Sequence, residues 1–77
     1  MYSFIEGKIA SINPATAVVA CQGIGYNIHI SLHTYTKIKD AESCRLYTHL
    51  IVREDAMQLY GFADLLERNV FQQLISV

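Results

Sequence analysis

Two adjacent carboxylates, Glu54 and Asp55, follow Arg53 in a charged triplet that interrupts two apolar runs. Paired carboxylates can act as a general acid and base, or they can repel a phosphate group that approaches them. Neighbouring strand residues point to opposite faces, and no nucleophile, third ligand or phosphate-binding loop accompanies the pair. We therefore assign no catalytic residue. The residues alone favour a solvated polar turn with a strong local negative field.

The other residues whose side chains could bind a metal or react are three histidines and two cysteines. His29 and His33 are four positions apart, but they fall at the end of one expected element and the start of the next, which disfavours a shared metal ion. His49 lies in an alternating apolar segment, where a hydrogen-bonded packing role is expected. Cys21 and Cys44 form no Cys-x-x-Cys pair, so the spacing excludes a zinc ribbon. We assign no metal and no cofactor.

Composition limits the class of protein. The chain has 77 residues, of which 52% are hydrophobic and 17% charged, as expected for one small folded core. Six Lys and Arg against seven Asp and Glu give a net charge of −1, so no broad cationic surface is available to bind DNA by counterion release. No run reaches the about 18 to 20 apolar residues of a membrane span. We expect a cytoplasmic chain without a membrane partner.

The positions of the charged triplet and the histidines depend on the elements around them. Asn13-Pro14 and Gln22-Gly23 have the composition of turns, and Gly25 suggests a bulge or bend within a strand. The charged triplet then occupies the tip of a hairpin. Five segments show the period of two that is typical of strands: residues 2–11, 16–21, 24–30, 45–52 and 56–62.

Two segments show helical spacing instead. Residues 31–39 predict a short connector helix with an apolar stripe of Leu32, Tyr35 and Ile38, capped by Ser31 or Thr34. The last predicted helix begins at Asp64, which stands three residues before Glu67 as in a capping box. Its apolar positions are Leu66, Val70, Phe71, Leu74 and Ile75. The element order predicts a mainly β fold, a five-stranded OB-fold Greek-key barrel with a short connector helix and a C-terminal α-helix.

Residues 46–62 are the most distinctive stretch. Their sequence, LYTHLIVREDAMQLYGF, strongly resembles the Y/F-T-H-x-x-V-R-E-D-A-x-x-L-Y-G-F core of the RuvA family of Holliday junction branch migration subunits. The segments at residues 7–9, 23–26 and 67–77 resemble the same family. The resemblance covers essentially the whole chain. One departure is the polar stretch at residues 40–43, where the family commonly has a glycine, and it leaves the shape of that loop open.

The resemblance implies the organisation of the chain and its partners. Residues 1–62 would form the OB-fold domain, and residues 63–77 would begin a truncated helical (helix-hairpin-helix) domain. The expected function is to oligomerise and to form the centre at which the junction is bound. The chain would be part of a non-catalytic subunit of an ATP-dependent branch migration helicase complex for recombination and repair. The implied partners are four-way junction DNA, a homotetramer or octamer, and the RuvB motor and RuvC resolvase through the full-length protein. The main duplex contacts would follow residue 77.

The same resemblance gives the charged triplet a role. Glu54 and Asp55 would be an acidic pin where the four DNA arms meet, and Arg53 would either support the pin or contact a phosphate. The alternative from the residues is a stand-alone OB-fold module that binds single-stranded nucleic acid or a protein partner. In that case tyrosines would serve as stacking platforms. The alternating positions of Tyr26, Tyr47 and Tyr60 favour packing instead.

Overall fold

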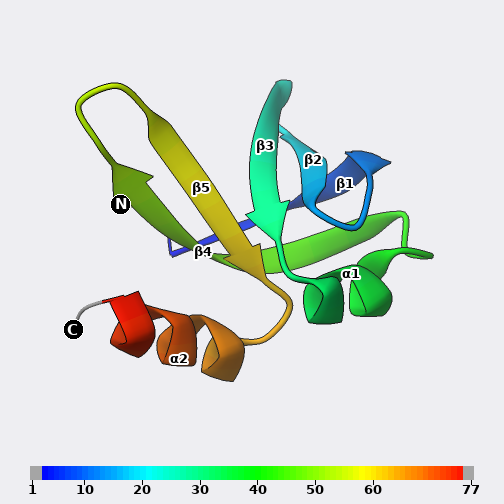
Figure 1. Ribbon diagram of the computed structural model, residues 1–77. Coiled ribbons are helices and arrows are strands. Elements are labelled where there is room, and N and C mark those ends of the chain that lie inside the picture. Colours follow the sequence, from blue (N-terminus) through cyan, green and yellow to red (C-terminus); the bar gives the residue numbers. More distant parts are fainter. Residues whose placement is uncertain (1–2, 76–77) are drawn as a thin grey trace.

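Five strands form a closed barrel in the computed structural model, which describes residues 3–75 (Figure 1). Around the barrel the order is β1-β2-β3-β5-β4; β3 and β5 are parallel, and the other neighbours are antiparallel. This order, with a helix between β3 and β4, confirms the predicted mainly β OB-fold barrel and both of its helices. The elements are β1 Phe4–Ile12, β2 Thr16–Cys21, β3 Ile24–Ile30, α1 Leu32–Ile38, β4 Ser43–Val52, β5 Met57–Phe62 and α2 Leu65–Ile75.

The two turns of the first three strands form where the sequence predicts them. The Asn13 side-chain oxygen accepts hydrogen bonds from the backbone N–H groups of Ala15 (2.8 Å) and Thr16 (2.9 Å), which reverses the chain between β1 and β2. Gln22 and Gly23 have φ angles of 55° and 82°. Positive φ at both central residues characterises the type I′ turn, whose twist matches that of the flanking strands.

Strand β1 belongs to both halves of the barrel, because its first half pairs with β4 and its second half with β2. A side chain at Gly7 would collide with the Ala20 carbonyl, so glycine permits the close approach of β1 and β2 at this point. The pairing shifts between Ile9 and Ser11, which places a bulge in β1. At Gly25, where we predicted a bulge or a bend, the bulge is wrong, since the β2–β3 register continues through this residue unchanged.

The core lies inside the barrel and reaches the buried side of α1. Fully buried side chains include two threonines, Thr34 and Thr48, whose hydroxyl groups need hydrogen-bond partners within the fold. The buried apolar residues are Ile5, Ala17, Val19, Ile28, Ile30, Ile38, Leu46 and Phe62. Cys21 and Cys44 are free and half-buried, and burial raises the pKa of the Cys44 thiol.

Helix α1 covers one end of the barrel with a face that matches the predicted one only in part. Ser31 is its N-cap, as predicted, because its hydroxyl oxygen accepts from the backbone N–H of Thr34 at 3.1 Å. Thr34 and Ile38 are the buried residues, and Tyr35 is half-buried. Leu32 is 65% exposed, so the predicted apolar stripe is wrong at its first position.

Helix α2 lies across the outer face of β4 and β5, and its main aromatic contact with these strands is the side chain of Phe71. The Phe71 ring centroid is 5.0 Å from that of Phe62, 5.2 Å from Tyr60 and 5.7 Å from His49. Gln72 Nε2 lies 3.1 Å from His49 Nδ1, which confirms the hydrogen-bonded packing role predicted for this histidine. The other apolar residues of α2 are largely exposed: Leu65, Leu66, Val70, Leu74 and Ile75. Within the described residues, no helix is long and apolar enough to cross a membrane.

Candidate functional site

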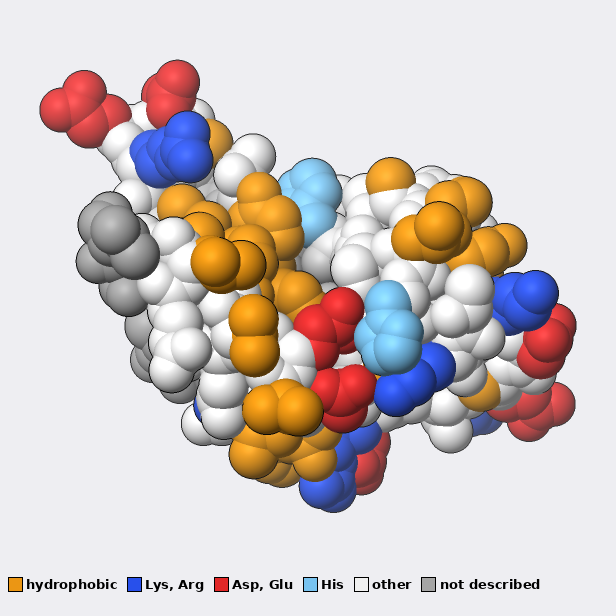
Figure 2. Space-filling model, turned by 60° about the horizontal axis from the view of Figure 1, so that its bottom comes forward, with side chains coloured by type: hydrophobic (Ala, Val, Ile, Leu, Met, Phe, Trp, Pro, Cys, Tyr) orange, Lys and Arg blue, Asp and Glu red, His pale blue; other side chains and the backbone are white. Residues whose placement is uncertain are grey.

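The charged triplet lies at the end of the hairpin formed by β4 and β5. The backbone N–H of Arg53 donates to the Ala56 carbonyl at 2.7 Å, and the N–H of Ala56 donates back to the Arg53 carbonyl at 3.4 Å. Glu54 and Asp55 are therefore the two residues of the turn itself. Figure 2 shows acidic side chains at the far end of a protrusion, with basic and hydrophobic side chains directly behind them.

The conformation of this turn differs from that of the β2–β3 turn. In residues 3–75, the only positive φ angles belong to Gln22 and Gly23, so neither Glu54 nor Asp55 adopts the left-handed conformation of a primed turn. The hairpin is aligned instead by its strands, whose register runs without a shift from Tyr47 opposite Phe62 to Val52 opposite Met57. The tip is thus presented by two strands that pair without a shift, and not by turn residues that require a positive φ.

The charges of the tip have no partner among the described side chains. No residue in 3–75 forms a side-chain hydrogen bond or ion pair with Arg53, Glu54 or Asp55. By contrast, Glu6 Oε1 accepts from Arg45 Nε at 2.7 Å on the barrel wall, which raises the pKa of Arg45. Two neighbouring carboxylates are therefore exposed without a neutralising side chain among the described residues, and ionic screening confines their field to about 8 Å at physiological salt.

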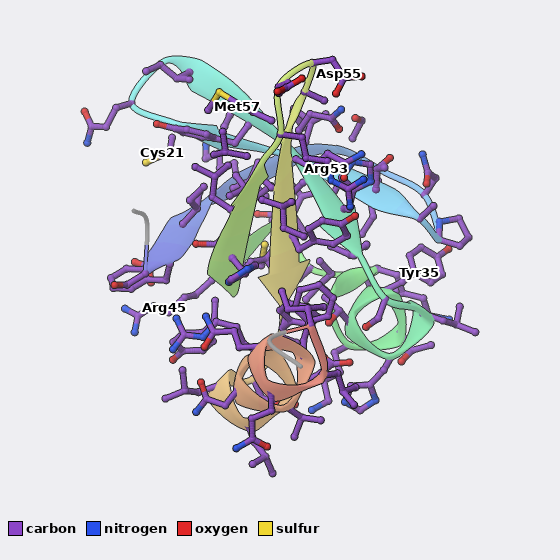
Figure 3. The ribbon with its side chains drawn as sticks, turned by 60° about the vertical axis from the view of Figure 1, so that its left-hand side comes forward. Cys21, Tyr35, Arg45, Arg53, Asp55 and Met57 are labelled. Atoms are coloured by element: carbon purple, nitrogen blue, oxygen red, sulfur yellow. The ribbon has the colours of Figure 1, made fainter. Side chains whose placement is uncertain are left out.

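The two faces of the hairpin carry different side chains. Residues directly opposite each other in an antiparallel pair share a face, and faces alternate along each strand. Arg53 and Ala56 thus lie on one face, and Val52 and Met57 on the other. In Figure 3, Arg53 and Met57 lie on opposite sides of the hairpin below Asp55.

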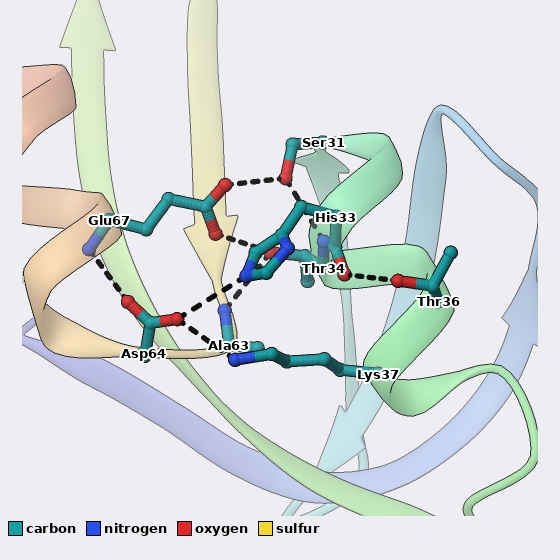
Figure 4. Close-up of polar contacts among 8 residues, drawn as sticks. All are labelled: Ser31, His33, Thr34, Thr36, Lys37, Ala63, Asp64 and Glu67. Atoms are coloured by element: carbon teal, nitrogen blue, oxygen red, sulfur yellow. Dashed lines mark hydrogen bonds and ion pairs between the residues drawn. The ribbon is translucent and has the colours of Figure 1, made fainter.

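A second polar cluster joins α2 to α1 beneath the barrel (Figure 4). Glu67 Oε2 accepts from the Ser31 hydroxyl at 2.9 Å, and Glu67 Oε1 accepts from the Thr34 hydroxyl at 3.0 Å. The Thr34 oxygen also accepts from the backbone N–H of Ala63 at 3.1 Å. Asp64 Oδ1 caps α2 by accepting from the Glu67 N–H at 2.7 Å. We call these residues, with Lys37 and His33, the helix-linking cluster.

Asp64 is the electrostatic centre of the helix-linking cluster. The Glu67 N–H, followed by Lys37 Nζ at 3.1 Å, holds the pKa of Asp64 below its ordinary value. His33 Nε2 lies 3.6 Å from the same carboxylate. The donor atoms of His33, Asp64 and Glu67 lie within 4.8 Å of one another, a spacing that could hold a cation. Lys37 already supplies a positive charge, and both Glu67 oxygens already accept hydrogen bonds, so the observed arrangement is a structural link.

The sequence predicted parts of this cluster but not its assembly. The capping positions of Ser31 and Asp64 are confirmed. Glu67 does not complete a capping box, because its carboxylate binds α1 instead. His29 and His33 have different neighbours, the Tyr60 ring at 5.2 Å and Asp64 respectively. The sequence carried no signal for the Glu67 contacts, since they join residues more than thirty positions apart.

Residues 1–61 match the family described as RuvA N terminal domain. The chain belongs to this family. Three relatives named "Holliday junction branch migration complex subunit RuvA" are 53% identical (Bacteroides fragilis strain YCH46), 48% identical (Cytophaga hutchinsonii) and 43% identical (Alkaliphilus oremlandii) over 77 residues. Each alignment covers 100% of this chain but only 38%, 39% and 40% of the respective relative. The chain therefore spans about two fifths of the length of these relatives.

The RuvA N-terminal domain match confirms the resemblance seen in residues 46–62. The matched range includes the whole β4–β5 tip and α1, whereas α2 lies outside it. The roles expected for Glu54, Asp55 and Arg53 come from that resemblance and remain predictions.

Proposed function

We propose that this chain is the junction-centre domain of a RuvA-type protein that binds Holliday junctions in the cytoplasm during recombination and repair. It would be a non-catalytic part of a branch migration complex. Membership in the RuvA N-terminal domain family supports the class of substrate. The observation that carries the mechanism is the unneutralised pair Glu54 and Asp55, held at the end of a hairpin whose strands pair without a shift from Tyr47 opposite Phe62 to Val52 opposite Met57.

The physical effect of such a tip on DNA is local repulsion. A carboxylate within about 4 Å of a phosphate is repelled by about 1 kcal/mol in water and by about 4 kcal/mol at an effective dielectric constant near 20. Screening confines the effect to about 8 Å, so the tip acts only on phosphates beside it. Strands that separate at a crossover keep their phosphates away from the tip, but a continuous duplex does not. The tip would therefore select junction shape and not base sequence.

The full assembly needs further surfaces. We propose a homotetramer or octamer in which several tips meet at the crossover, with the RuvB motor and RuvC resolvase recruited by the full-length protein. Residues 1–62 would be the OB-fold domain, and residues 63–77 the start of a helical domain that carries the main duplex contacts. The apolar side chains exposed along α2, among them Leu66 and Leu74 at 73% each, support a further packing partner for that helix.

The alternative, a single-strand-binding module, has less support. Stacking platforms need exposed aromatic faces. The described tyrosines Tyr26, Tyr35, Tyr47 and Tyr60 are all half-buried. Tyr60 lies between the His29 ring and the Phe71 ring, each with a centroid distance of 5.2 Å.

The test removes the charges of the tip and keeps its shape. The variant Glu54→Gln with Asp55→Asn is introduced into the gene product that carries this chain, and its affinity for a four-way junction is compared with that for linear duplex. Loss of about 1 kcal/mol of discrimination per carboxylate predicts that the junction-to-duplex affinity ratio falls at least tenfold.

The matched control is Asp40→Asn with Glu42→Gln. It makes the same change in net charge at two exposed acidic residues that also have no side-chain partner among the described residues. The control should leave the ratio unchanged. An unchanged ratio in the Glu54 and Asp55 variant would refute the proposed pin.

A further inference from the structure

Helix α2 faces the barrel with its polar side. Together with its cap, the helix has five half-buried residues whose spacing of three, four, seven and eight positions places them on one face: Asp64, Glu67, Arg68, Phe71 and Gln72. Phe71 is the only apolar residue of this set. The exposed positions include the apolar residues Leu65, Leu66, Val70, Leu74 and Ile75. The helix is thus attached by polar groups and one aromatic ring, which reverses the usual arrangement of an amphipathic helix.

A two-residue link joins β5 to α2. β5 ends at Phe62 and α2 begins at Leu65, so that Ala63 and Asp64 form the whole link. Each residue has two backbone dihedral angles that rotate easily, and a link of two residues therefore permits many directions for the helix. The observed direction of α2 must come from its side-chain contacts.

The contacts in the second half of this face hold α2 against the strands but do not fix its tilt. Phe71 packs on rings of β4 and β5 with centroid distances of 5.0 to 5.7 Å, and burial of apolar surface has no preferred direction. Gln72 adds one hydrogen bond, at 3.1 Å, to His49 Nδ1. Arg68 Nη1 donates to the Ser3 carbonyl over 3.4 Å, which is long for a hydrogen bond. A helix held by these contacts alone could still tilt.

Glu67 supplies the directional contact near the start of α2. Each of its carboxylate oxygens accepts from a different hydroxyl of α1 and its cap, Oε2 from Ser31 at 2.9 Å and Oε1 from Thr34 at 3.0 Å (Figure 4). Both hydroxyls are held in place, because the Ser31 oxygen caps α1 and the Thr34 oxygen accepts from the Ala63 N–H. Two charge-assisted hydrogen bonds to separate fixed groups define the position and the rotation of the carboxylate, which a single bond does not.

We propose that Glu67 is a positioning residue that sets the direction in which α2 leaves the barrel, and thereby places the segment after residue 77 relative to the acidic tip. The inference rests on the proposed function, in which the tip lies at the junction centre and the main duplex contacts follow residue 77. A tilt of about 10° would move a group about 30 Å away, the length of a 20-residue helix, by about 5 Å. That displacement exceeds the length of a hydrogen bond to a phosphate.

The expected consequence differs between two kinds of DNA. A linear duplex can adjust its position on the surfaces that bind it. A four-way junction must place its arms on those surfaces and its crossover at the tip at the same time. Affinity for the junction therefore depends on the direction of α2 much more strongly than affinity for the duplex does.

The test replaces Glu67 by methionine in the full gene product. Methionine forms helices about as well as glutamate, but its thioether is only a weak hydrogen-bond acceptor. Glu67→Met should lower affinity for a four-way junction by about tenfold or more, and affinity for linear duplex by less than about threefold. Glu67→Gln, which keeps one carbonyl acceptor, should recover most of the lost junction affinity.

A second variant tests the same contact from α1. Ser31→Gly removes the donor to Glu67 Oε2 but keeps a residue that is well tolerated at an N-cap. It should lower the ratio of junction affinity to duplex affinity in the same direction as Glu67→Met and by a smaller factor. This variant decides the question if circular dichroism shows that Glu67→Met is unfolded.

Two controls separate direction from stability and from charge. Val19→Ala lowers stability inside the barrel, because Val19 is fully buried on β2, and leaves the helix-linking cluster unchanged. Glu42→Met makes the same change in charge as Glu67→Met at an exposed carboxylate. Both controls should keep the wild-type ratio of junction affinity to duplex affinity.

The outcomes separate this inference from the proposed function. If the wild-type protein shows no preference for four-way junctions, the proposed function is wrong. If the wild type has this preference and both Glu67→Met and Ser31→Gly retain it, the positioning role is wrong and the proposed function stands. An equal decrease of the ratio in Glu67→Met and Val19→Ala, or an equal loss of junction and duplex affinity, also overturns the positioning role, because neither result depends on the direction of α2.

Discussion

Replacing Thr34 by valine should destabilise the protein strongly, although the two side chains have nearly the same shape. Thr34 is fully buried, and its hydroxyl both donates to Glu67 Oε1 at 3.0 Å and accepts from the Ala63 N–H at 3.1 Å. The variant loses a hydrogen bond to a charged group, worth about 1.5 to 3 kcal/mol, and leaves the Ala63 N–H without this acceptor, a further loss of about 1 kcal/mol. The expected decrease in the free energy of unfolding is therefore about 2.5 to 4 kcal/mol.

Urea denaturation and thermal unfolding measure this change directly. For a domain of this size, 1 kcal/mol corresponds to about 4 to 8 °C in Tm, so Thr34→Val should lower Tm by about 10 °C or more. Thr36→Val is the matched control, because Thr36 is on the same helix but exposed, with one local bond to the His33 carbonyl at 2.8 Å. The control should change stability by less than about 0.5 kcal/mol. Equal effects of the two substitutions would refute the role of Thr34 in joining α1 to α2.

Two further predictions concern packing and pH. Gly61→Ala should lower the free energy of unfolding by about 1 to 3 kcal/mol in urea denaturation, because its methyl group would lie 2.6 Å from Ile28 Cγ2 inside the barrel; Gly25→Ala, at an exposed position, should be milder. The pKa of Asp64 is lowered in the folded state, so its stabilising contribution is present above its unfolded pKa of about 4 and is lost as pH falls through the lower folded value. Asp64→Asn should therefore make the decrease in the free energy of unfolding below about pH 4 shallower. An unchanged dependence on pH in this range would contradict the stabilising role of the Asp64 carboxylate.

The barrel itself could be predicted largely from local patterns. The alternation of apolar residues predicted the positions of all five strands. The Asn13-Pro14 and Gln22-Gly23 pairs predicted the two turns that join the first three strands. The pairing of β3 with β5 followed from the element order typical of the fold and not from any local signal. The bulge expected at Gly25 was wrong, because a glycine is compatible with several backbone conformations and does not specify which of them forms. The actual bulge in β1 follows from the bend that this strand needs to pair with both β4 and β2.

The exposure of the helices was harder to predict. Leu32 and the apolar positions of α2 other than Phe71 have the spacing of buried residues, yet they are exposed, whereas Thr34 is fully buried. Periodicity shows which residues share a helix face but not what covers that face. Only the position of α2 across the barrel decides that Phe71 packs on Tyr60 and Phe62 while its neighbours do not.

The charged triplet shows the same division between local and long-range information. The residue pattern predicted that Arg53, Glu54 and Asp55 occupy the tip of a hairpin, because a short charged segment between two alternating apolar strands is most stable in a solvated turn. The family resemblance in residues 46–62 added the expectation of a pin. The folded barrel shows, in addition, that the hairpin extends beyond its neighbouring strands, which exposes Val52 and Met57 and keeps the tip charges away from the other described side chains. Exposure and charge pairing depend on which distant segments lie nearby, and residue spacing along the chain does not contain that information.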